Sequence, residues 1–222
     1  PNIRIRGGAS LSSSNNPLIV IDGVPISNDN PAGVSNPFSL INPNDVCLII
    51  FNMQLELIPL LHNSYKLTHD CRWLADLFDT HQLPTVLIEH KKLGQLARSI
   101  KEVAPKAKIM EKHHFSIMKE EHIMSHLASL NKKQLVLAGA ESHVCIFQSS
   151  VNLQQAGYEI FVLSDTISAR NESDNRQAIE RLKYHQYQLI TKEMLFFELI
   201  EHSELPNYLE LARKFLDGRY IK

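Results

Sequence analysis

The 222-residue chain carries 23 basic and 24 acidic residues, so its formal charge of -1 offers no excess of either sign for binding nucleic acid or anionic lipid. Hydrophobic residues make up 44% of the chain, which is ordinary for a globular protein with its own core, and the longest apolar runs are too short to span a bilayer. We therefore expect a small-molecule substrate or a second copy of the chain as the partner, with neither nucleic acid nor membrane involved.

The three cysteines, Cys47, Cys71 and Cys145, are too widely spaced to suggest a disulfide framework. Free thiols persist in reducing compartments, so this pattern predicts a cytoplasmic location.

Residues 1–45 differ in composition from the rest of the chain. Gly, Pro, Ser and Asn are frequent there and divide the backbone into turns, which leaves room for little more than one strand at 18–21. The composition alone favours a flexible leader.

Three stretches within this segment are more specific than its composition. They read Arg4-Ile-Arg-Gly-Gly8, Asn16-Pro-Leu-Ile-Val-Ile-Asp-Gly-Val-Pro25 and Leu40-Ile-Asn-Pro-Asn-Asp45. Together they resemble the plug domain of SusC-like TonB-dependent outer-membrane receptors, and the resemblance stops abruptly near Val46. It implies a foreign plug-like segment, left by a fusion or gene joining, with no transport function of its own; a regulatory appendage is the alternative.

From residue 46 onward, apolar runs of strand length alternate with segments of helical periodicity. The run 46–51 is continuously apolar, as expected for a strand that is buried on both faces, and a helix at 62–80 follows it. The further predicted elements are strand 84–89, helix 94–103, strand 107–110, helix 119–130, strand 134–140, helix 143–156, strand 159–163, helix 172–184, strand 188–190 and helices 193–200 and 206–216.

This alternation predicts right-handed βαβ units over residues 46–222. The expected fold is α/β, a Rossmann-like three-layer sandwich in which a mostly parallel sheet has helices on both faces, preceded by the irregular N-terminal segment. Ligands in such sheets bind beyond the carboxyl ends of the strands. That rule selects Asn52, 89–90, 111–112 and 140–145 as one neighbourhood.

Cys145 follows a buried strand that breaks at Gly139 into the start of a helix. A thiol in a first helical turn lies near the positive end of the helix dipole and near unpaired N–H groups, which favour the thiolate. The same N–H groups could receive an oxyanion. A buried structural cysteine is the alternative, and the local sequence does not separate the two.

Lys112 and Asn52 each stand where a predicted strand ends. An ammonium group beside a thiol lowers the pKa of the thiol, but taken alone Lys112 is better explained as a solvated surface lysine. Asn52 is placed to face the strand-end crevice, although taken alone it is better explained as the cap of the next turn.

Considered together, these positions lie in segments that carry a second resemblance. Leu48-Ile-Ile-Phe-Asn-Met-Gln54, Met110-Glu-Lys-His-His-Phe-Ser116 and Leu137-Ala-Gly-Ala-Glu-Ser-His-Val-Cys145 resemble the three catalytic segments of the isochorismatase-like cysteine hydrolases. The stretch 157–170 also resembles a strand and loop of that family. The likeness extends over about residues 46–216 and is closest to the isochorismatase domain-containing subgroup.

The resemblance implies roles for five residues. Cys145 is the nucleophile, Lys112 gives positioning and electrostatic support, and Asn52 occupies the third catalytic position. Ala140 and Glu141 are joined by a non-proline cis peptide bond, which turns backbone N–H groups toward the oxyanion. Relatives often form oligomers, so a homo-oligomer is expected.

One departure from the family pattern bears on activity. The general base of the family is Asp, whereas this chain has Asn52, and an amide cannot accept the thiol proton. General-base catalysis is typically worth about 10²–10⁴ in rate. Glu89, Glu111 and Glu141 are open alternatives as the base.

Two functions follow from this pattern. The first is a cofactor-independent hydrolase that acts on a small amide or related acyl substrate through a thioester at Cys145. The alternative is a catalytically impaired family member that binds a ligand or a partner.

No metal is expected in the site. The nicotinamidase branch of the superfamily holds a metal with an Asp-x-His pattern and a further His, and residues 87–92 lack that pattern. His113 and His114 cannot both face one site on an extended strand, because successive side chains alternate.

Overall fold

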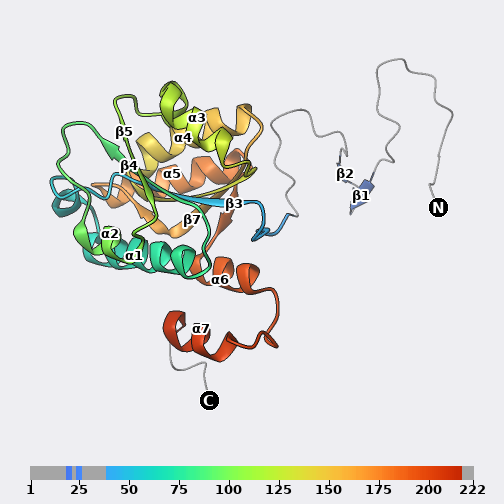
Figure 1. Ribbon diagram of the computed structural model, residues 1–222. Helices are drawn as coiled ribbons and strands as arrows, with labels where there is room; N and C mark the ends of the chain where they lie inside the picture. Colours follow the sequence, from blue (N-terminus) through green and yellow to red (C-terminus); the bar gives the residue numbers. More distant parts are fainter. Residues whose placement is uncertain (1–18, 22–23, 27–38, 217–222) are drawn as a thin grey trace.

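Six strands form one parallel sheet at the centre of the protein, as the computed structural model shows for the residues that it describes, 19–21, 24–26 and 39–216 (Figure 1). The spatial order is β5-β4-β3-β6-β7-β8, and every neighbouring pair is parallel. The strands are β3 (Val46–Phe51), β4 (Thr85–His90), β5 (Lys108–Lys112), β6 (Gln134–Ala140), β7 (Glu159–Ser168) and β8 (Gln188–Ile190). The predicted Rossmann-like α/β sandwich is confirmed.

Both faces of the sheet are covered by helices, and β3 contributes to the cores on the two sides. Its side chains alternate, with Val46, Leu48 and Ile50 in one core and the three others in the second. The first core contains residues of α1 (Ser64–Thr80), α2 (Arg98–Val103), α6 (Lys192–Ile200) and α7 (Tyr208–Phe215). The second contains residues of α3 (Glu121–Ser129), α4 (Phe147–Gln155) and α5 (Glu172–Tyr184). Burial on both faces is why this strand is apolar throughout.

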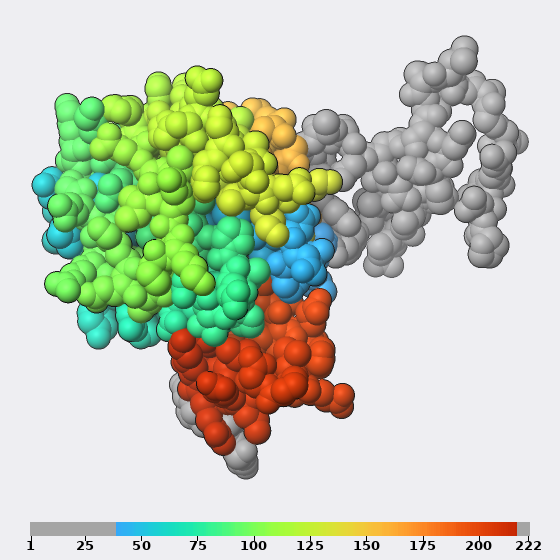
Figure 2. Space-filling model, in the orientation of Figure 1, coloured from blue at the N-terminus to red at the C-terminus, as the bar shows by residue number. Residues whose placement is uncertain are grey.

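Helices α6 and α7 form a lobe beside α1, coloured red in Figure 2. Trp73 on α1 joins the lobe to the rest of the domain, since its indole Nε1 donates a hydrogen bond of 2.8 Å to the carbonyl oxygen of Phe215. Its ring also packs against those of Phe196 and Phe215. A partly buried indole usually finds such a partner for its N–H group.

Several elements differ from the predicted ones at their ends. The predicted helix 94–103 forms only from Arg98, because Gly94 adopts a positive φ and Leu96 pairs with Gln54 in an isolated bridge. The predicted helix 143–156 consists of the π-helix η3 (Ser142–Ile146) followed by α4, and 119–130 consists of the 3-10 helix η2 (Ile117–Lys119) followed by α3. Strand β7 runs five residues past the predicted end, and the β6–β7 register shifts between Leu137 and Gly139. The short 3-10 helix η1 (Ile58–Leu60) was not predicted.

The described part of the N-terminal segment contains two short strands. β1 (Ile19–Ile21) pairs in antiparallel fashion with β2 (Val24–Ile26), whereas the sequence predicted only one strand here. The rest of the plug-like stretch up to residue 38 lies outside the described residues.

Residues 39–45 contact the α/β domain. Ile41 is 3% exposed within the first core, and its backbone N–H donates to Glu198 at 2.9 Å. The N–H of Asn42 donates to the side chain of Gln134 on β6 at 2.6 Å. We therefore propose that the domain begins before the predicted boundary at residue 46.

None of the helices in the described part of the chain is both long and apolar enough to cross a membrane.

Candidate active site

The order of the strands reverses between β3 and β6, since β4 and β5 lie on one side of this pair and β7 and β8 on the other. In open parallel sheets ligands bind at the carboxyl ends of the strands beside such a switch point. Asn52 directly follows β3, Glu141 directly follows β6, and Lys112 is the last residue of β5. The fold therefore brings the residues singled out by sequence to one edge of the sheet.

Lys112 and Cys145 are in direct contact. The Lys112 Nζ atom donates a hydrogen bond of 3.2 Å to the Cys145 Sγ atom and a second, of 3.0 Å, to the carbonyl oxygen of His114. Lys112 is 0% exposed and Cys145 is 3% exposed. The interpretation of Lys112 as a surface lysine is wrong, because its amine is enclosed in the fold beside the thiol.

Burial also changes the proton affinity of the amine. Loss of hydration lowers the pKa of Lys112 below its usual value, while Cys145 and the carboxylate of Glu120 act in the opposite direction. An ammonium group in such surroundings therefore gives up its proton at a lower pH than a solvated lysine does.

Cys145 belongs to the π-helix η3, which begins directly after the cis peptide bond between Ala140 and Glu141. π-helical turns occur mostly as short insertions and frequently at functional sites. Two N–H groups of this turn, those of Val144 and Ile146, donate to the carbonyl oxygen of Glu141 at 3.3 and 3.2 Å. These two groups are engaged within the turn, so an oxyanion would need other donors of the same segment.

Asn52, directly after strand β3, lies in the left-handed region, with a φ of 52°. Asn tolerates this conformation better than most residues. The side chain is 1% exposed, and its Oδ1 atom has no hydrogen-bond partner among the described residues. The predicted turn cap is therefore not made by this oxygen.

Two further polar atoms near the nucleophile are also buried without a hydrogen-bond partner among the described residues. Ser142 Oγ and His143 Nδ1, both in η3, are buried without a hydrogen-bond partner in the part of the chain described. Most buried polar groups are hydrogen-bonded, so such atoms at a strand-end site point to water or ligand as the missing partner.

Glu120 holds the loop that follows Lys112. Its Oε1 atom accepts hydrogen bonds from the backbone N–H groups of His113 and His114, at 2.7 and 2.9 Å, and from the His114 ring at 2.9 Å. Burial opposes ionisation of this carboxyl, but the three donors outweigh it and lower its pKa to about 2. Since the carbonyl of His114 receives Lys112, Glu120 stabilises the surroundings of the amine. Sequence reasoning missed this role, although Glu120 lies in the first turn of the predicted helix 119–130, where an acidic residue is a recognisable signal.

Gln54 has a similar role for the loop after β4. Its amide Nε2 donates to the carbonyls of His90 and Gly94 at 3.0 and 2.6 Å, while its Oε1 accepts from the His90 N–H at 2.7 Å. This residue stood in the first recognised segment without an assigned role. Its side-chain amide thus hydrogen-bonds the N–H and carbonyl groups of His90, the last residue of β4, in the way that a neighbouring backbone would.

The three glutamates considered as alternative bases are engaged elsewhere. Glu89 accepts from the N–H of Leu96 at 3.0 Å, Glu141 pairs with Arg170 at 2.8 Å, and Glu111 lies 3.7 Å from the His113 ring. None of them is hydrogen-bonded to Cys145 in the described structure. His113 and His114 lie near different carboxylates, and within the described residues no three His, Cys, Asp or Glu side chains are grouped as metal ligands.

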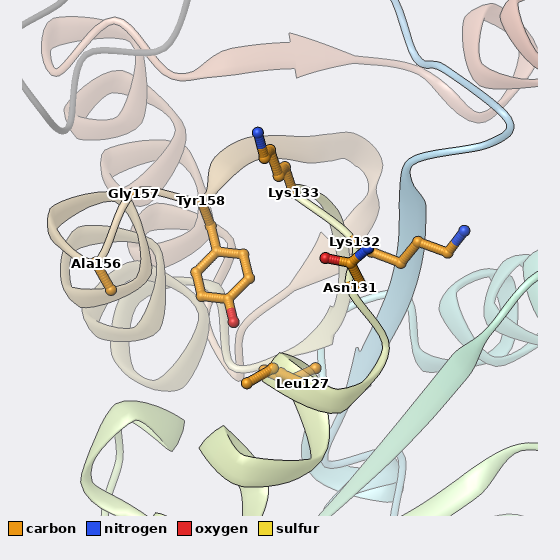
Figure 3. A pocket seen from close by; sticks show the side chains of 8 residues that line it. Leu127, Asn131, Lys132, Lys133, Ala156, Gly157 and Tyr158 are labelled. Carbon is orange, nitrogen blue, oxygen red and sulfur yellow. The ribbon is translucent and has the colours of Figure 1, made fainter.

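Two cavities lie at the opposite edge of the sheet, near the amino ends of the strands. One, of about 240 Å³, is bordered by Tyr158, whose ring points toward Leu127 while the Lys133 side chain points away from it (Figure 3). The other, of about 450 Å³, borders Thr85 at the start of β4. Neither cavity contains a residue of the Lys112–Cys145 pair.

The isochorismatase domain matches residues 46–194 of this chain. The chain belongs to the isochorismatase family. Isochorismatase family protein 1A of Dictyostelium discoideum is 24% identical over 184 residues, which cover 78% of this chain and 89% of that protein.

Two solved structures of relatives share the fold. The MAR1 ribonuclease structure from Caenorhabditis elegans has a TM-score of 0.75 at 25% identity, covering 81% of this chain and 94% of that one. YcaC of Escherichia coli, described as an octameric hydrolase of unknown specificity, also has a TM-score of 0.75, at 22% identity, covering 82% and 93%.

The N-terminal segment has a separate relative. A stretch of 44 residues is 57% identical to the TonB-dependent receptor SusC of Bacteroides thetaiotaomicron, which is 20% of this chain and 4% of the receptor. The chain thus combines similarity to two unrelated proteins, as the sequence predicted.

Proposed function

We propose that this protein is a cysteine hydrolase that cleaves a small amide or related acyl compound through a thioester at Cys145. The contact of 3.2 Å between Lys112 Nζ and Cys145 Sγ carries the proposal. A cation at this distance favours the thiolate, which is the reactive form of cysteine. The position of the pair at the switch point of the sheet gives the reaction a place where substrates bind in related folds.

In the proposed reaction, the Cys145 sulfur attacks the carbonyl carbon of the substrate and forms a tetrahedral oxyanion. Backbone N–H groups of the segment around the Ala140–Glu141 bond stabilise that oxyanion. The amine then leaves, and water hydrolyses the thioester. The unpartnered atoms Asn52 Oδ1 and Ser142 Oγ are available to hydrogen-bond polar groups of the substrate.

Membership of the isochorismatase family and similarity to YcaC, named a probable hydrolase, support this chemistry, and the octameric state of YcaC supports a homo-oligomer in this case too. No cofactor or metal enters the proposal, and the location we propose is cytoplasmic.

Asn52 favours a second candidate function. Because an amide cannot accept a proton from the thiol, the protein could bind a substrate-like ligand at the same site without turning it over. The two functions share a site and differ in whether the thiol is activated.

The test is a panel of small amides offered to the parent protein, to Cys145→Ala and to Asn52→Asp. We expect saturable hydrolysis by the parent, an acyl adduct on Cys145 in a quenched reaction, and a loss of at least about 10³-fold in Cys145→Ala. Turnover only in Asn52→Asp would favour the binding protein instead. Hydrolysis that survives Cys145→Ala would exclude the proposed nucleophile.

A further inference from the structure

We propose that Lys112 is itself the general base that takes the thiol proton of Cys145, and the acid that returns a proton to the leaving amine. The inference rests on the proposed function, since it assigns the proton transfers of the same thioester chemistry. It starts from a juxtaposition: the buried amine of Lys112 is hydrogen-bonded to the sulfur of the proposed nucleophile, and the third position that the sequence resemblance singles out carries an amide, Asn52, which cannot accept a proton.

The first step of the argument is the charge balance of the buried pair. An ionised group inside a protein requires an opposite charge or a strong set of hydrogen bonds. Lys112 Nζ donates to the Cys145 sulfur and to one carbonyl oxygen, and no ion pair joins it to a carboxylate within the described residues. Only two states of the pair are neutral, namely amine with thiol and ammonium with thiolate. One proton moving between Nζ and Sγ interconverts them.

The side chains of the other charged and titratable neighbours do not form a direct ion pair or hydrogen bond with Lys112 Nζ or Cys145 Sγ among the described residues. The carboxylate of Glu120 attracts a proton to Lys112 through its charge, but its Oε1 atom is occupied by the loop 113–114. The ring of His114 is bonded to that same carboxylate, and the ring of His90 contacts the Lys91 carbonyl and the ring of Phe115. Neither ring is hydrogen-bonded to the sulfur in the described structure.

Asn52 determines which group acts as the base. In the family pattern that the sequence resembles, an Asp at this position is the general base that accepts the thiol proton, so that the lysine can stay charged throughout. With the amide, the state of ammonium plus thiol has the charge of Glu120 nearby, but among the described residues no carboxylate is bonded to the Lys112 Nζ atom. Burial of Lys112, which lowers its pKa, further favours an amine that can accept the proton.

The proton transfers balance over a full cycle. The S–H bond breaks and an N–H bond forms on Lys112, giving thiolate and ammonium. The thiolate forms a C–S bond with the substrate carbonyl, and as the C–N bond breaks the ammonium returns its proton to the departing amine. Neutral Lys112 then takes a proton from the water that attacks the thioester. The water oxygen forms a C–O bond with the thioester carbon, the C–S bond breaks, and the acid product leaves, which restores thiolate and ammonium.

Lys112→Arg separates the proposed role from electrostatic support. Arg keeps the positive charge beside the sulfur, but its pKa is above about 12, so it neither accepts nor returns the proton. We therefore expect iodoacetamide labelling of Cys145 to stay within about threefold of the parent rate, because the cation still favours the thiolate. Hydrolysis of the amide found in the screen should fall by about 10²–10⁴.

A second variant supplies the missing base. In Asn52→Asp combined with Lys112→Arg, the carboxylate should accept the proton and recover at least about tenfold of the lost hydrolysis. Lys112→Ala gives a further readout, because added methylamine should restore formation of the acid product in proportion to its unprotonated fraction. The acid is measured because direct attack by methylamine would give an amide.

Hydrolysis by Lys112→Arg at the parent rate would overturn the inference, and so would labelling and hydrolysis that decline in parallel. Methylamine rescue that is independent of the unprotonated fraction would also count against it. Failure of the proposed function would look different: either the parent hydrolyses no amide, or hydrolysis survives Cys145→Ala.

Discussion

Gly139 on β6 lies so close to Phe51 on β3 that a Cβ atom on Gly139 would stand 2.3 Å from the Phe51 carbonyl oxygen. The φ of Gly139 is +102°, a backbone conformation that side-chain-bearing residues rarely adopt. This close approach brings the end of β6, which leads to the nucleophile, against the end of β3, which leads to Asn52. The absence of a side chain at Gly139 is thus a condition for the geometry of the site.

Gly139→Ala should therefore destabilise the fold by about 3 kcal/mol or more and slow the labelling of Cys145, because the two strands must separate. Gly157→Ala is the matched control. Gly157 also has a positive φ, of +94°, but no atom of the described residues lies within 4 Å of the added carbon, so only about 1 kcal/mol is expected. Urea unfolding measures both, and equal losses would contradict the steric explanation.

The three cysteines should differ sharply in reactivity. Burial raises the pKa of the Cys47 thiol to about 12 and that of Cys71 above its usual range, whereas Cys145 has the Lys112 amine as its partner. At pH 8, iodoacetamide should label Cys145 at least about 100-fold faster than the other two in the native protein. In urea all three should react alike. Mass spectrometry of the peptides reads the labels, and comparable native labelling of Cys47 would count against the argument.

Glu120→Gln tests the anchored loop beside Lys112. Because the pKa of Glu120 is about 2 in the fold against an ordinary value of 4.5, its stabilising contribution is present above pH 4.5 and is lost as the pH falls toward 2. The variant should lose about 2 kcal/mol of unfolding free energy at pH 7, since the acceptor of three hydrogen bonds is weakened. Between pH 4.5 and 2 the unfolding free energy of the variant should fall less than that of the parent, because the variant has no carboxylate at position 120 to protonate.

Glu111→Gln is the control for this change, since it neutralises an exposed carboxylate on β5 near the same loop. It should change the unfolding free energy by less than about 0.5 kcal/mol. The explanation would fail if Glu111→Gln and Glu120→Gln had the same effect at pH 7.

The boundary between the two parts of the chain can be located with two truncations. A chain of residues 39–222 should unfold cooperatively, and its free energy of unfolding should equal that of the α/β domain in the full-length protein. A chain of residues 46–222 should be about 2 kcal/mol less stable, because it lacks the buried Ile41 and the hydrogen bond from Asn42 to Gln134. Thermal and urea melts of the two chains give the comparison, and equal stability would move the boundary back to residue 46.

Much of the fold is legible in short stretches of sequence, because burial and periodicity are local patterns. The apolar run of β3 predicts a strand covered on both faces, and β6, α5 and β8 have the bounds that their patterns predict. The segments that end at Gln54, Ser116 and Cys145 are specific enough to indicate the family.

The chemical state of the site depends on contacts between parts of the chain that are distant in sequence. Lys112 has the sequence context of a surface residue, and it is buried because its edge strand ends beside a helix that begins 30 residues later. The roles of Glu120 and Gln54 depend on which backbone groups the ends of β4 and β5 leave unpaired. Proton affinity, hydrogen bonding and close backbone approach depend on three-dimensional neighbours, and a linear pattern does not specify those neighbours.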